Sequence, residues 1–138
     1  MKHITINLEN LKNNIRTNNQ ISTATHDLAL YLMLKYNLFR SADNKVYSFR
    51  DNTLKYVDLR ELINEEIAPV QANTQLVKKV TSYFRYIGTN DILKRYFRVA
   101  NGKETLDSTA GLSYKAVAEV ITEEVQRLED LKARVTIN

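Results

Sequence analysis

The sequence predicts a mainly α-helical fold with one β-hairpin. Apolar residues recur at intervals of three and four in several segments, the spacing of a helix that buries one side. The chain has only three glycines and one proline, so few positions interrupt these segments. One stretch, YSFRDNTLKYVD at 47–58, instead alternates apolar and polar residues around Asp51-Asn52, which indicates two strands joined by a two-residue turn.

Composition limits the classes of function. The 138 residues and 43% hydrophobic content suit one domain with a core. Because the chain has no cysteine, disulfides and thiol chemistry are excluded, and the distant His3 and His26 cannot form a metal site by themselves. No apolar run has the length of a membrane helix, and the start, MKHITINLEN, lacks the features of a signal peptide. We expect a soluble, cytoplasmic protein without membrane contact.

Catalytic motifs are missing from the sequence. It has no phosphate-binding loop, no dinucleotide-binding glycine pattern, no nucleophile elbow and no HExxH pair. Two groups of carboxylates occur on predicted helices, and we interpret them as solvated faces in preference to metal sites: Glu61, Glu65 and Glu66, and Glu119, Glu123 and Glu124. We therefore expect no enzyme, no metal and no cofactor.

The charge is segregated along the chain. The formal net charge is +4, but residues 71–103 carry seven Lys/Arg against one Asp, a balance of +6. Residues 104–138 carry four Lys/Arg against seven Asp/Glu, a balance of −3. A basic block of this kind is a candidate surface for a polyanion such as nucleic acid.

The first third of the chain holds an ambiguous segment and a clear helix. HITINL has the period of a strand, whereas NLENLKNNI has helical spacing, and the polar RTNNQIST that follows suggests a mobile connector. We therefore predict an N-terminal arm over residues 1–22. Thr25 is placed to cap the next helix, which reaches Asn37 and is apolar nearly all round, so it is the expected central core helix.

The hairpin at 47–58 is expected to have two different faces. A turn at Asp51-Asn52 pairs Tyr47 with Tyr56 and Ser48 with Lys55. Since strand side chains alternate, one set faces the core and the other faces water. The core set is Tyr47, Phe49, Leu54 and Tyr56, and the outer set is Ser48, Arg50, Thr53 and Lys55.

Four further helices follow from capping signals and periodicity. Asp58 caps a helix over 59–67 that stops before Pro69, and Asn73 or Thr74 caps a helix over 75–87 that Gly88 ends. A short helix is predicted over 90–100, ending near Asn101-Gly102. A long helix is predicted over 112–135.

The helix over 75–87 predicts a nucleic-acid-binding face. Opposite its apolar stripe stand Gln75, Lys78, Thr81, Ser82 and Arg85, without a carboxylate, as suits contact with phosphates and base edges. The alternative is an ordinary solvated face, but the next predicted helix and the hairpin repeat the basic pattern. The predicted nucleic-acid-binding residues are Lys78, Lys79, Ser82, Arg85, Lys94, Arg95, Arg98, Arg50 and Lys55, with Tyr86 as a candidate for stacking on a base.

The long helix near the C-terminus has two interpretations. Its apolar positions, with charged residues around them, suit docking to a partner or self-association through Val117, Ile121, Val125 and Leu128. The alternative is packing against its own domain. We accordingly predict a segment over 104–138 that either docks or self-associates, with a homo-oligomer through residues 112–138 as one outcome.

A resemblance covers about 60 of the 138 residues. The segment from LALYLMLKYNLF to VTSYFRYIG resembles the accessory domain that precedes the helicase in phage, plasmid and poxvirus-type primase–helicases. The residues that carry it are Tyr36-Asn37-Leu38, the hairpin strands at 46–49 and 54–56, and the helix at 76–86. The hairpin departs from the family in having no glycine at its tip, and the primase and ATPase motifs are absent, so the resemblance is to the accessory domain alone.

The resemblance implies a winged-helix-like domain over residues 23–103, followed by the long C-terminal helix. It also implies a non-enzymatic, nucleic-acid-binding accessory role in the replication of a phage, virus or plasmid. The expected partners are DNA and a replicative primase or helicase, in the host cytoplasm if the protein is viral. The alternative function is a protein-interaction module, a viral adaptor or inhibitor of a host protein, that acts through the C-terminal helix.

Overall fold

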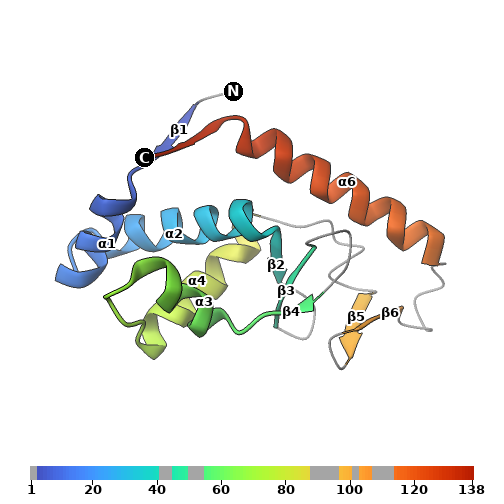
Figure 1. The fold of residues 1–138 in the computed structure, drawn as a ribbon, viewed down its shortest axis with the longest axis horizontal. Helices are drawn as coiled ribbons and strands as arrows, with labels where there is room; N and C mark the ends of the chain where they lie inside the picture. The colour runs from blue at the N-terminus through green and yellow to red at the C-terminus, as the bar shows by residue number, and fades with distance from the viewer. Residues whose placement is uncertain (1–2, 41–44, 50–54, 88–96, 101–102, 107–113) are drawn as a thin grey trace.

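The computed structural model describes residues 3–40, 45–49, 55–87, 97–100, 103–106 and 114–138. This part of the chain is mainly helical and includes a small antiparallel sheet of three strands (Figure 1). The helices are α1 (Leu8–Thr17), α2 (Ile21–Tyr36), α3 (Leu59–Ile67), α4 (Thr74–Ile87) and α6 (Tyr114–Lys132). The strands are β1 (Ile4–Ile6), β2 (Leu38–Arg40), β3 (Val46–Ser48), β4 (Lys55–Tyr56), β5 (Phe97–Ala100), β6 (Lys103–Leu106) and β7 (Val135–Ile137).

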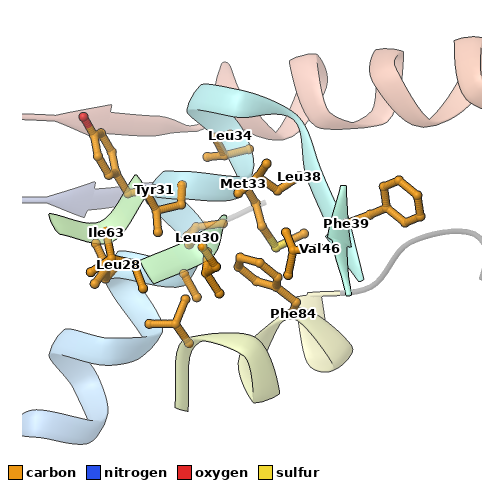
Figure 2. Packing of buried hydrophobic residues seen from close by; sticks show 14 of the residues in the cluster. Leu28, Leu30, Tyr31, Met33, Leu34, Leu38, Phe39, Val46, Ile63 and Phe84 are labelled. Atoms are coloured by element: carbon orange, nitrogen blue, oxygen red, sulfur yellow. The ribbon is translucent and has the colours of Figure 1, made fainter. Parts of the chain in front are cut away.

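Helix α2 is the centre of the core, as the sequence predicts. All residues from Leu28 to Leu34 are buried, and α1, α4 and α6 pack against the helix from different sides (Figure 1). Figure 2 shows Met33 of α2 close to Phe84 of α4 and Val46 of β3, which belong to the same buried cluster. A helix that is apolar all round is stable in water only when neighbours cover every side.

The start of α2 differs from the prediction. The helix begins at Ile21, and the expected cap Thr25 lies inside it, buried, with its hydroxyl donating to the backbone oxygen of Ile21 over 2.6 Å. The polar RTNNQIST supplies the end of α1, the start of α2 and a tight turn between them. Asn18 and Gln20 in this turn have left-handed backbones, with φ of 57° and 46°.

The central sheet confirms the predicted register and adds a strand. Tyr47 pairs with Tyr56 and Ser48 with Lys55, as expected. Strand β2, which the sequence did not indicate, pairs with the other edge of β3. The rest of the predicted hairpin, residues 50–54, lies outside the described residues.

The two faces of the hairpin differ in part from the prediction. Tyr47 and Phe49 are buried as expected, but Ser48 is buried too, because its hydroxyl is satisfied by the backbone oxygen of Tyr36. Tyr56 was predicted to face the core and is 54% exposed. It lies on the edge strand and touches Tyr47 only edge to face, with 6.0 Å between ring centroids.

Helices α3 and α4 begin at the side-chain caps that the sequence predicts. Asp58 accepts a hydrogen bond from the backbone N–H of Glu61 over 3.2 Å, and Asn73 accepts one from Leu76 over 2.8 Å. Arg60 of α3 donates to the backbone oxygen of Ala72 and to the Thr74 hydroxyl, both over 3.0 Å. These bonds hold the start of α4 against α3.

Residues 1–22, predicted as an N-terminal arm, contain β1 and α1. Strand β1 pairs in parallel with β7, with Ile4 opposite Val135 and Ile6 opposite Ile137. Leu11 of α1 is buried, and α1 packs against α2. The prediction of a helix up to residue 135 was wrong at its end, because α6 stops at Lys132 and Val135 lies in β7, where its backbone pairs with β1.

The helix predicted over 90–100 was wrong over the four residues of β5. Strand β5 pairs antiparallel with β6, with Ala100 opposite Lys103. The sequence between these two positions is Asn101-Gly102, the pair most favoured in two-residue hairpin loops, and it was interpreted as the end of a helix. Residues 90–96 of the predicted helix lie outside the described residues.

Helix α6 packs its apolar stripe on its own chain. Ile121 and Leu128 are 3% and 2% exposed, Val125 is partly buried against the same core, and α6 contacts α2. Val117 lies on α6, but its side chain is outside the described part. Glu124, predicted on a solvated face, is 5% exposed and pairs with Arg127 over 3.1 Å. No helix in the described ranges is long and apolar enough to cross a membrane.

Candidate nucleic-acid interface

Helix α4 presents a basic face, which we define as Lys78, Lys79 and Ser82. All three side chains are exposed, because Leu76, Val80 and Phe84 on the opposite side are buried against α2 and its neighbours. The sequence of α4, TQLVKKVTSYFRYI, contains no carboxylate. The two ammonium groups are therefore not neutralised from within their own helix, and the face suits an anionic partner.

The other predicted residues are distributed more widely. Thr81, expected to face outward, is half-buried and donates its hydroxyl to the backbone oxygen of Val77 over 2.8 Å. Arg98 lies on β5 opposite Thr105, not on a helix next to α4. The side chains of Arg85 and Tyr86 on α4, and the residues Arg50, Lys94 and Arg95, lie outside the described part of the chain.

A groove runs between β4 and α4, with a volume of about 220 Å³. We call it the aromatic groove. It is lined by Lys45, Val46, Tyr56, Val57, Asp58, Leu59, Arg60, Val77 and Thr81. The ammonium group of Lys45 lies 5.8 Å from the centroid of the Tyr56 ring, and Lys55 is exposed on the same strand as Tyr56. The hairpin thus contributes an exposed ring and the cation of Lys45 to a groove that α4 lines with Val77 and Thr81.

Tyr56 and Lys45 were missed as site residues. Strand alternation assigns Tyr56 to the core face, and no local signal shows that the core ends before this residue. Lys45 precedes the strand in a polar turn, SADNK, that carries no motif. The one usable signal is that lysines stand at both ends of the paired segment, at positions 45 and 55, with Tyr56 next to the second.

A second polar cluster connects α2 to α3 around Glu66. Glu66 was predicted on a solvated face, yet its side chain is only 11% exposed. It accepts hydrogen bonds from Lys35 over 2.7 Å, from the Tyr31 hydroxyl over 2.8 Å, and from the Tyr36 hydroxyl. The cluster joins two helices and uses its donors internally, which indicates a structural role.

The pKa values in this cluster follow from burial and these bonds. Burial acts to raise the pKa of Glu66, but the hydrogen bonds from Lys35, Tyr36 and Tyr31 outweigh it and hold the pKa below its ordinary value. The bond to Glu66 raises the pKa of Lys35. Burial and then the bond to Glu66 raise the pKa values of Tyr31 and Tyr36. All four groups are therefore fixed in their neutral-pH charge states.

No group of three or more metal-ligating side chains is found within the described ranges. Comparisons with protein-family models, with curated proteins and with solved structures found no match to this chain. The candidate site therefore rests on the chain's own residues: the basic face of α4 and the aromatic groove beside it.

Proposed function

We propose that this chain is a non-enzymatic nucleic-acid-binding protein. The observation that carries the proposal is the exposed pair Lys78 and Lys79 on a helix without a carboxylate, and the exposed ring of Tyr56 lines a groove with Val77 and Thr81 of the same helix. The layout supports a winged-helix-like mode, with α4 as the helix that meets the nucleic acid and the β3–β4 ribbon as the wing. The resemblance to the primase–helicase accessory domain favours a role in replication of a phage, virus or plasmid.

Each part of the interface has a distinct role in the proposal. Lys78 and Lys79 neutralise backbone phosphates and release counterions, which makes affinity fall with salt. Ser82 donates to a phosphate or a base edge. Tyr56, with Lys45 over its ring, offers an aromatic surface on which a base can stack.

Protein interaction through α6 has less support than nucleic-acid binding. Ile121 and Leu128, the centre of the predicted docking stripe, are in the core of this chain. A partner would have to displace α2 to reach them, at a cost of several kcal/mol for each exposed side chain.

A salt-dependent titration against single- and double-stranded DNA tests the proposal. We expect binding whose logarithm falls linearly with the logarithm of salt, and a Lys78→Ala, Lys79→Ala variant whose slope is smaller by about 2, one for each lost phosphate contact.

The matched control is Lys115→Ala, Lys132→Ala, which removes the same charge from exposed positions of α6. It should keep the slope of the unmodified chain. If the two double variants weaken binding equally, binding depends on the net charge of the protein and not on the basic face of α4. If the unmodified chain does not bind DNA, the proposal is excluded.

A further inference from the structure

A second cleft lies on the other flank of α4, where the end of α1, the start of α2 and the turn between α3 and α4 meet. Figure 1 shows α1 and this turn at the same end of the molecule. The cleft has a volume of about 410 Å³, within the range of about 300–1,000 Å³ that is usual for small-molecule sites. Its lining residues are Ile15, Arg16, Asn18, Ile21, Pro69, Val70, Gln71, Asn73, Gln75, Leu76 and Lys79. We call it the amide cleft.

The rim of the amide cleft is cationic and rich in amides. Arg16 and Lys79 are exposed, and none of the described lining residues has a carboxylate. The guanidinium of Arg16 donates to the neutral side chain of Asn13 over 2.6 Å, a bond that orients the group and leaves its charge available. Asn18, Gln71 and Gln75 add both donors and acceptors at the rim.

The floor of the amide cleft is apolar. Leu76 is buried, and Ile15, Ile21 and Val70 are half-buried, so aliphatic groups lie beneath the amides. A flat aromatic ring can lie on such a floor while its edge meets the amide groups, and a phosphate attached to it can meet Arg16 and Lys79. This combination of a ring, polar edges and a phosphate describes a nucleotide.

We propose that the amide cleft holds one unpaired nucleotide, with its base on the aliphatic floor and its phosphate between Arg16 and Lys79. The inference rests on the proposed function for its macromolecular context, because Lys79 belongs both to the cleft and to the basic face of α4. A strand that follows α4 reaches the cleft through this shared residue. A base held in a stacked pair cannot enter, so the cleft selects single-stranded nucleic acid.

The test compares three ligands on the full chain: a thymidine oligonucleotide of about 12 nucleotides, a duplex of the same length, and dTMP. Arg16→Gln removes a charged donor from the cleft and leaves Lys78 and Lys79 in place. We expect it to weaken oligonucleotide binding about tenfold, the value of one charge-assisted hydrogen bond, and to change duplex binding by less than about twofold. Lys115→Gln, an equal loss of charge on α6, is the matched control.

A second variant probes recognition of the base. Gln71→Ala removes an exposed amide that makes no cap. We expect it to weaken binding of the oligonucleotide. Binding of an abasic strand of the same length should not change, because that strand has no base for the Gln71 amide to contact. Circular dichroism melts check that both variants remain folded.

The outcomes separate this inference from the proposed function. If Arg16→Gln weakens oligonucleotide binding no more than Lys115→Gln does, the cleft assignment is overturned while strand binding stands. If dTMP binds in an Arg16-dependent way but no strand binds, the nucleotide site is supported and the proposed function fails. If the unmodified chain binds none of the three ligands, both are overturned.

Discussion

The ammonium group of Lys35 lies 2.7 Å from Oε1 of Glu66, and this ion pair fastens the last turn of α2 to α3. Glu66 is shielded from water, whereas Lys35 is 46% exposed. The two tyrosine hydroxyls that share the carboxylate, from Tyr31 and Tyr36, are partly buried. The three hydrogen bonds that Glu66 accepts replace the water that its carboxylate loses on burial. If the carboxylate is removed, the three donors lose this acceptor.

Replacement of Glu66 should therefore destabilise the fold. We expect Glu66→Ala to lower the free energy of unfolding by about 2–3 kcal/mol, mainly through the tyrosine hydroxyls, because the exposed Lys35 regains water. Urea denaturation followed by circular dichroism measures this change. The control is Glu65→Ala, an exposed neighbour that should stay within about 0.5 kcal/mol. Equal effects at the two positions would contradict the role of the cluster.

The same cluster predicts a pH dependence at the acid side. Because the pKa of Glu66 is below its ordinary value of 4.5 in the folded state, its stabilising contribution is present above pH 4.5 and is lost as the pH falls through the folded-state pKa. The stability difference between the unmodified chain and Glu66→Gln should thus be constant near neutrality and shrink in acid. A stability difference between the two proteins that grows below pH 4.5 would contradict a lowered pKa for Glu66.

At the alkaline side, the raised pKa values of Lys35, Tyr31 and Tyr36 act in the opposite direction. Their contribution is complete below the ordinary values of 10.5 for lysine and 10.0 for tyrosine, and it is lost as the pH rises through the folded-state values. Thermal unfolding of Tyr31→Phe and Tyr36→Phe should therefore show less alkaline destabilisation than the unmodified chain. An unchanged alkaline profile in both variants would contradict the assignment.

Helix α6 should behave as part of the core. Leu128→Ala is expected to cost about 2–4 kcal/mol of stability, because it leaves a cavity beside α2, and to leave the oligomeric state unchanged. Denaturation and analytical ultracentrifugation measure the two quantities. A variant of full stability whose mass in solution changes would instead identify Leu128 as an interface residue. Glu129→Ala, an exposed neighbour, is the control.

Tyr56 should matter for binding and little for stability. We expect Tyr56→Ala to weaken binding of single-stranded DNA by about 1–3 kcal/mol, the value of one stacked base, whereas Tyr56→Phe keeps the ring and most of the affinity. Since the chain has no tryptophan, Tyr56→Trp supplies a fluorophore whose quenching reports on stacking directly. Binding without any quenching would place the strand elsewhere.

Local signals were sufficient for the elements whose ends are set by neighbouring residues. Asp58 and Asn73 cap α3 and α4 with their own side chains, and both were readable from the sequence. The pairing of Tyr47 with Tyr56 followed from the position of the two-residue turn at Asp51-Asn52. In each instance the interacting groups are within about ten residues, so the sequence itself carries their geometry.

Tertiary packing determined what the sequence did not predict. Strands β1 and β7 pair across almost the whole chain. HITINL shows a strand period that contains β1, but it overlaps the helical spacing of NLENLKNNI, and the three residues of β7 are too few to show a period. The three-residue β2 was hidden for the same reason. The same distinction holds for the candidate sites. Helical periodicity predicted that Lys78 faces outward, whereas only the packing of the folded chain brings Arg16 of α1 to the same cleft as Lys79.

The parallel pairing of β1 with β7 has a consequence for synthesis. Ile6 is 1% exposed, and the backbone of its strand bonds to residues 134 and 138, which are translated more than a hundred residues later. During translation, strand β1 is therefore synthesised long before its partner β7. We expect the β1–β7 pairing to be one of the last parts of the fold to form. A chain that ends before residue 135 would therefore lack the strand that pairs with β1, and it would leave the backbone of Ile4–Ile6 without these bonds.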